Sequence, residues 1–175
     1  MYAPVDRPVP LPDTVERFPA WSPDQLAGCH SSLQRLYEYW LARRGNRPMP
    51  ARSDIDPIDL KAVLPLLILI DVVPDPRRYV YRLVGTHEVE IRGFDPTGKA
   101  VSEAYYGEST DVTTGYLDQI VRTRQPLLYR GTYQTLRTRT QREDVLFLPL
   151  SQDGETVNMI MVLGHIEWLK DERPI

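Results

Sequence analysis

Three charged residues that could form an acid–base site, Arg52, Asp54 and Asp56, stand close together in the chain. An arginine beside two carboxylates is one arrangement that can hold and transfer a proton. The alternative is a structural clasp, in which Asp54 or Asp56 caps a helix expected near Ile58 while Arg52 or Arg82 pairs with a carboxylate. We favour the clasp, because a catalytic carboxylate also needs a substrate pocket and nothing in this segment specifies one.

Histidine and cysteine could bind a metal or activate a nucleophile, and the chain has only His30, His87, His165 and Cys29. No two histidines lie at metal-ligand spacing, and the adjacent Cys29 and His30 cannot readily hold one ion. The chain lacks a Gly-x-Ser-x-Gly elbow and a phosphate loop. His165 alternates in phase with the apolar residues of segment 157–163, so we expect it in the core or lining a cavity. The sequence therefore predicts no catalytic residue and no metal.

Six arginines follow one another with no acidic residue between them: Arg122, Arg124, Arg130, Arg137, Arg139 and Arg142. Arginine binds phosphate and carboxylate through paired hydrogen bonds, so a phosphorylated ligand, an RNA or an acidic partner would suit this stretch. The alternative, which we favour, is a solvated strand face balanced by Glu143, Asp144 and Asp153. The neighbouring Tyr129 and Tyr133 are expected on the opposite face, which makes a nucleic-acid surface unfavourable. The net charge of −3 adds no bulk attraction to nucleic acid.

Length and composition favour one globular domain with a tail, since the chain has 175 residues of which 42% are hydrophobic. A single cysteine cannot form an internal disulfide and fits a reducing compartment. The longest apolar run, residues 64–70, is too short to span a bilayer. The first residues do not have the pattern of a secretory signal. We therefore expect a cytoplasmic protein that has no membrane segment.

Residues 1–24 contain six of the sixteen prolines and are expected to form neither helix nor sheet ladder, so this segment is either a disordered arm or an extended strap. The first helix is expected from Ser31, with Gln34 completing a capping box, to a stop at Gly45. Its apolar stripe is either core or a dimer seam. We expect the helix to lie outside the domain core and to form a homodimer interface through Leu33, Leu36, Tyr37 and Trp40.

The remaining pattern predicts an α+β fold with five antiparallel strands, at residues 66–73, 77–84, 127–137, 143–151 and 156–167. A short helix is expected over 58–63 and a longer one over 113–124. The first and last strands are apolar on both faces, so we place them centrally, in the spatial order second, first, fifth, fourth, third. The helical middle of the chain is expected on one face of this sheet.

Two segments carry a resemblance to a known family. The stretch Leu83–Lys99 predicts a strand end at Gly85, a short helix ending at Gly93, and a tight turn, while Leu36–Pro57 forms a distinctive lead-in. Together they resemble a PAS-like family of stand-alone bacterial proteins, over about residues 31–167. The resemblance implies a sensory or regulatory fold with no established reaction. It divides the chain into a proline-rich arm, an N-terminal helix with linker, a PAS-like domain and a tail, at residues 1–27, 28–60, 61–167 and 168–175.

The resemblance also implies a ligand cavity between one sheet face and the helical middle. If the tyrosines point there, its ligand-binding residues are Tyr81, Tyr116, Tyr129, Tyr133 and His165, and it suits a small semi-polar organic molecule. The alternative is an ordinary packed core. Haem-carrying PAS domains usually place a histidine on the long helix, and flavin-binding ones place a cysteine in the helical middle. Neither is present at those places here, so no cofactor is expected.

The function expected from these observations is a non-catalytic bacterial sensory module. It would bind a small molecule or a partner protein and signal by contact. One alternative is a small enzyme of a cone-shaped α+β fold, of the hydrolase or isomerase type, which would need a buried carboxylate–histidine pair in its cavity. Another is a ligand-free dimerisation adaptor with a filled core.

Overall fold

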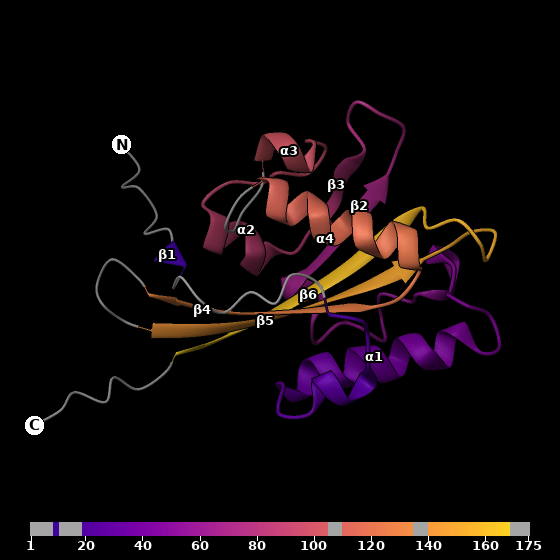
Figure 1. The fold of residues 1–175 in the computed structure, drawn as a ribbon, viewed down its shortest axis with the longest axis horizontal. Helices are drawn as coiled ribbons and strands as arrows, with labels where there is room; N and C mark the ends of the chain where they lie inside the picture. Colours follow the sequence, from indigo (N-terminus) through magenta and orange to yellow (C-terminus); the bar gives the residue numbers. More distant parts are fainter. Residues whose placement is uncertain (1–8, 11–18, 105–109, 135–139, 169–175) are drawn as a thin grey trace, which may run out of the picture.

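A curved antiparallel sheet forms the centre of the molecule (Figure 1). The computed structural model describes residues 9–10, 19–104, 110–134 and 140–168. The strands lie in the order β1-β4-β5-β6-β2-β3, and every neighbouring pair is antiparallel. Their bounds are Val9–Pro10 for β1, Leu67–Val72 for β2, Tyr79–Val84 for β3, Leu127–Gln134 for β4, Thr140–Leu150 for β5 and Met159–Trp168 for β6.

The predicted order of the five long strands is confirmed, with β2 and β6 in the interior of the sheet. Both strands are apolar on their two faces, which only a strand covered on each side can stabilise. The arm was expected to form no ladder, and this is wrong for Val9 and Pro10, which pair with Gln134 and Tyr133 at the edge of the sheet. An edge strand tolerates proline because the missing N–H can face away from the ladder.

Three helices lie on one face of the sheet (Figure 1): α2 (Thr86–Arg92), α3 (Val101–Ala104) and α4 (Thr110–Thr123). The chain leaves β3 and enters α2 at Gly85, where a Cβ atom would lie 2.3 Å from the Pro65 carbonyl oxygen. Only glycine fits at that distance. Gly93 ends α2 with a φ of +77°, in the left-handed region that glycine favours. The predicted glycine breaks are thus confirmed and have separate steric causes.

The opposite face of the sheet is covered by α1 (Ser31–Arg44), which packs on β5 and β6 (Figure 1). The expectation that this helix lies outside the core is wrong. Leu33, Leu36 and Trp40 are fully buried within the chain, and the Trp40 indole Nε1 donates a 2.9 Å hydrogen bond to the Pro149 carbonyl oxygen. These three side chains are therefore not a homodimer interface. The uncovered sheet face needed a partner, and this helix supplies it.

Tyr37, the fourth residue assigned to the dimer seam, is half-buried and meets the Trp21 ring edge-on, with centroids 5.2 Å apart. The helix begins differently from the expected Ser31 capping box. His30 Nδ1 accepts from the Ser32 backbone N–H, and the Gln34 amide donates to carbonyl oxygens that precede the helix. The helix is therefore capped by His30, and Gln34 stabilises the loop before the helix instead of completing a capping box with Ser31.

Short 3-10 turns connect these elements, at Pro23–Leu26, Arg52–Asp54 and Leu64–Leu66. The helix expected over 58–63 is a series of turns. Nowhere in the described ranges does a helix reach the length and apolarity required to cross a lipid bilayer.

Candidate functional site

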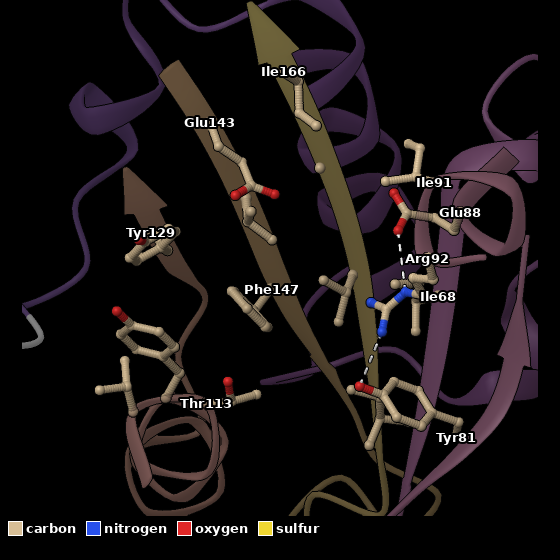
Figure 2. Close-up of a pocket in the computed structure, with 16 residues that line it drawn as sticks. Ile68, Tyr81, Glu88, Ile91, Arg92, Thr113, Tyr129, Glu143, Phe147 and Ile166 are labelled. Carbon is tan, nitrogen blue, oxygen red and sulfur yellow. Dashed lines mark hydrogen bonds and ion pairs between the residues drawn. The ribbon is translucent and has the colours of Figure 1, made fainter. Parts of the chain in front are cut away.

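A cavity of about 100 Å³ lies between the sheet and the helices α2 and α4 (Figure 2). Successive side chains of a strand point to opposite faces of the sheet, so every second residue of each strand is available to line the cavity. The apolar part of its wall is contributed mainly by the sheet, through Ile68, Ile70, Val145, Phe147, Val162 and Ile166. The helices close the other side with residues of α2 and α4, so the cavity is a space between two layers.

The cavity brings together three of the tyrosines singled out from the sequence, Tyr81 on β3, Tyr116 on α4 and Tyr129 on β4. The rings of Tyr116 and Tyr129 lie 5.1 Å apart at 53°. Phe147 continues this aromatic wall, 6.1 Å from Tyr116. Tyr133 lies on β4 paired with Gln141, but its side chain is outside the described part of the chain. Ligand binding by these tyrosines stays a prediction.

His165 does not belong to the cavity, and the expectation that it binds a ligand there is wrong. Gly164 and Ile166, its neighbours in β6, line the cavity, so His165 points to the face covered by α1. Its ring stacks on His30 with centroids 3.9 Å apart. Burial, followed by the nearby His30, lowers the pKa of His165. As predicted, His165 lies on the same side of β6 as the apolar residues with which it alternates, but that side faces α1 and not the cavity.

Two charged residues of α2, Glu88 and Arg92, face the cavity and were not predicted (Figure 2). Arg92 Nε lies 3.5 Å from Glu88 Oε2, one helical turn away. Arg92 Nη1 donates to the Tyr81 hydroxyl at 3.4 Å, and the guanidinium lies over the Tyr81 ring. Burial raises the pKa of Glu88, although Arg92 opposes this. Their four-residue spacing on one helix face was the only signal available in the sequence.

Glu143 is the third charged residue of the cavity and comes from β5. Sequence analysis placed it on a solvated face as a counter-charge for the arginines, and this is wrong. The side chain is half-buried, and burial, with the nearby Glu88, raises its pKa to about 7. It forms no hydrogen bond or ion pair with any residue that the structure describes. Its shared parity with Val145 and Phe147 in β5 could have placed it in the cavity.

Two arginines of the stretch, Arg130 and Arg142, are compensated by acids on the sheet face that α1 covers. Asp144 is 1% exposed, and its Oδ1 atom accepts from Arg130 Nε at 2.7 Å. Arg142 lies 3.8 Å from Asp144 and 2.9 Å from Glu167. The favoured interpretation, a balanced strand face, thus holds for these two arginines, with Glu167 in the place expected for Glu143. Arg137 and Arg139 lie outside the described residues.

The other residues expected to balance or oppose the arginines also have definite places. Asp153 accepts backbone N–H groups of Glu155 and Thr156, so it shapes the hairpin between β5 and β6. Tyr129 faces the cavity while Arg130 contacts Cys29 on the α1 side, at 3.0 Å from Nη2 to Sγ. The expected separation of tyrosine and arginine on opposite faces is therefore observed at this point of β4.

Asp54 and Asp56 accept backbone N–H groups, but turns stand where the capped helix near Ile58 was expected, and the arginine partner is Arg47. Asp54 accepts from the Ala51 N–H and from Arg47 Nη2, both at 2.7 Å. The Asp56 carboxylate accepts from the Ile58 N–H at 2.8 Å.

The two predicted arginine partners of the clasp act elsewhere. Arg52 donates to the Ile55 carbonyl oxygen at 2.9 Å, so it stabilises its own turn. Arg82 lies on β3 and lines a separate depression together with Arg52. Within the described residues, neither arginine forms an ion pair with Asp54 or Asp56. The ion-pair part of the clasp prediction is therefore wrong for both.

The described lining of the cavity is mostly apolar and includes three charged residues. The charged groups are Glu88, Arg92 and Glu143, and the polar hydroxyls are those of three tyrosines and Thr113. Its described lining contains no histidine or cysteine. His87, which follows β3, is instead exposed and lies 3.2 Å from Glu90. The carboxylate–histidine pair that the enzyme alternative requires is therefore not assembled by the described lining.

Comparison with known proteins places this chain in a family. Residues 29–166 match a PAS domain family. No curated protein matches the chain.

Solved structures with a similar fold are distant in sequence. The PAS domain of an HTR-like protein from Haloarcula marismortui is 15% identical, with a TM-score of 0.40, over 63% of this chain and 91% of that one. A Rhodobacter sphaeroides LOV protein is 10% identical, with a TM-score of 0.42, over 67% and 70%. A variant of the fungal photoreceptor Vivid is 11% identical, with a TM-score of 0.44, over 74% and 92%.

Proposed function

Because the chain belongs to the PAS domain family, we propose that it is a non-catalytic sensory or regulatory module that binds a small molecule in the cavity of Figure 2. Its signal would pass by contact with another protein. The single observation that carries this proposal is the cavity itself, lined by three tyrosines and a set of apolar side chains between two layers. Ligand sites are typically such apolar concave spaces with a few placed polar groups.

The size of the cavity supports a small ligand. An apolar cavity of about 150 Å³ engineered into another protein binds benzene, and the cavity here measures about 100 Å³. A molecule somewhat smaller than benzene would therefore fill it.

The described residues support a non-catalytic role over the enzyme alternative. A general acid–base pair needs its two groups within hydrogen-bond reach of one substrate. His165 faces α1 and His87 is exposed, so neither complements Glu143.

The adaptor alternative is also less well supported. Its central feature was the stripe on α1, and three residues of that stripe are used in the chain's own core. A homodimer, which we keep as part of the proposal, would have to use another surface. The proposed setting stays the bacterial cytoplasm, and a chain whose one cysteine cannot form an internal disulfide fits such a reducing compartment.

A thermal-shift screen of metabolites tests the proposal with two neighbouring variants of β6. Gly164→Ala adds a methyl group on the cavity side, where its nearest neighbours would be Val145 at 3.8 Å and Glu143 at 3.9 Å. His165→Ala changes the next residue on the opposite face and serves as the matched control. A cavity ligand should stabilise the wild type and His165→Ala equally and Gly164→Ala less. Equal shifts in all three proteins would place the site elsewhere and contradict the proposal.

A further inference from the structure

We infer that the cavity selects a small organic cation, a molecule that places a protonated amine-type nitrogen beside Glu143 and an apolar part against the sheet. This inference rests on the proposed function and names its ligand class.

The described lining of the cavity carries two carboxylates and one guanidinium. Arg92 is engaged with Glu88 at 3.5 Å and with the Tyr81 hydroxyl at 3.4 Å. Glu143 lies on the facing strand β5 (Figure 2), and no described residue pairs with it. A carboxylate removed from water is costly unless a cation or a donor meets it. A cationic ligand supplies that partner, whereas an anionic ligand would face two carboxylates.

Space for such a group is left open beside the Glu143 carboxylate. Gly164 of β6 has no side chain there, and an added Cβ atom would lie 3.9 Å from Glu143 Oε1. The surrounding wall is apolar, with Ile68, Val162 and Phe147 among its members. An apolar wall with one unpaired carboxylate complements a molecule that has an aliphatic body and one charged nitrogen.

Glu143 also makes cation binding depend on pH. Its pKa is about 7, raised first by burial and then by Glu88, with Arg92 acting in the other direction. A cation binds the ionised form, so it lowers this pKa and releases a proton. Affinity should therefore rise with pH through neutrality, by about tenfold between about pH 6 and pH 8. The other titratable groups that face the cavity, or lie next to Glu143 on the sheet, are Glu88, Arg92, Tyr81, Tyr116, Tyr129 and Asp144.

The test compares three probes with the same branched four-carbon skeleton, isobutylamine, isobutanol and isobutyrate, by titration of the nitrogen-15 NMR spectrum of the whole chain. Isobutylamine should shift resonances of cavity residues at lower concentration than the alcohol, and isobutyrate should bind most weakly. Glu143→Gln should weaken isobutylamine by about tenfold or more, the effect of one charge-assisted hydrogen bond, and should remove its pH dependence. Isobutanol binding should change little.

A matched control separates the local carboxylate from the net charge of the protein. Glu90→Gln removes the same charge from an exposed position on α2 and should leave isobutylamine binding unchanged. If isobutanol or isobutyrate binds the cavity as tightly as isobutylamine, or Glu143→Gln binds isobutylamine like the wild type, the cation inference fails while the cavity remains a binding site. If none of the probes shifts a cavity resonance, the cation inference fails, and the metabolite screen with Gly164→Ala and His165→Ala decides the proposed function.

Discussion

Glu143 and Asp144 are neighbours in β5, yet their carboxylates lie on opposite faces of the sheet and meet different surroundings. Asp144 is buried and accepts from Arg130 at 2.7 Å. Glu143 faces the cavity, and among the described residues it has no hydrogen-bonding partner. Strand alternation alone separates them. The same two-residue acidic sequence therefore supplies a structural ion pair on the α1 side and an available acceptor on the cavity side.

Asp144→Asn should destabilise the fold. The change removes a buried charge that faces Arg130 and Arg142, and we expect a loss of about 1–3 kcal/mol in the free energy of unfolding, because Arg130 is itself partly exposed. Glu167→Gln, at an exposed partner of Arg142, should cost less than about 1 kcal/mol. Urea unfolding of both variants is the measurement. Equal losses would show that burial of Asp144 does not matter.

Glu143→Gln should stabilise the protein at alkaline pH. In the folded chain the pKa of Glu143 is about 7, above the usual value of about 4.3, so the folded state holds a proton that the unfolded state releases between these values. The wild type therefore loses stability as pH rises through this window, and glutamine does not titrate. We expect the variant to exceed the wild type by about 1–3 kcal/mol near pH 8 and to match it near pH 5.

Urea unfolding across that range measures this difference. The matched variant Glu90→Gln changes an exposed carboxylate and should show no comparable change with pH. A constant difference between Glu143→Gln and the wild type at all pH values would contradict the raised pKa.

The sheet was predictable from sequence because its signals are local and repeated. Strands apolar on both faces belong in the interior of a sheet, and Gly154 after Asp153 is a hairpin signal. Contacts across layers were not predictable. The apolar stripe of α1 indicates that one face of the helix is covered, but it does not indicate what covers it. Trp40 was therefore assigned to a contact with a partner chain, whereas its indole donates to Pro149 in the sheet of its own chain.

The cavity was predictable only in part. Tyr81, Tyr116 and Tyr129 were assigned to it through the family resemblance, and they do line it. His165 was assigned to the wrong face, because alternation groups residues without saying which group faces which layer. Glu143 was missed because a charged residue is usually solvated. Its parity with apolar neighbours in β5 was the better guide.

Trp40→Phe tests the corrected place of α1. The change keeps an aromatic ring but leaves the Pro149 carbonyl oxygen without the indole donor at 2.9 Å, so we expect a loss of about 1–3 kcal/mol in the free energy of unfolding. Tyr37→Phe removes a hydroxyl from a half-buried position on the same helix and should cost less. Urea unfolding gives both values, and sedimentation should show no change of mass for either. A mass change without a stability loss would restore the dimer-seam interpretation.

Two glycine substitutions should have opposite effects, because one site has space for a methyl group and the other does not. Gly164→Ala places Cβ no closer than 3.8 Å to its neighbours and restricts the unfolded chain, so it should stabilise the ligand-free protein by about 0.4–1 kcal/mol. Gly85→Ala would place Cβ 2.3 Å from the Pro65 carbonyl oxygen and should lower the melting temperature strongly. Calorimetry of both variants is the measurement. If Gly164→Ala destabilised the protein as much as Gly85→Ala, the open space beside Glu143 would not exist, and the cation site would lose its steric basis.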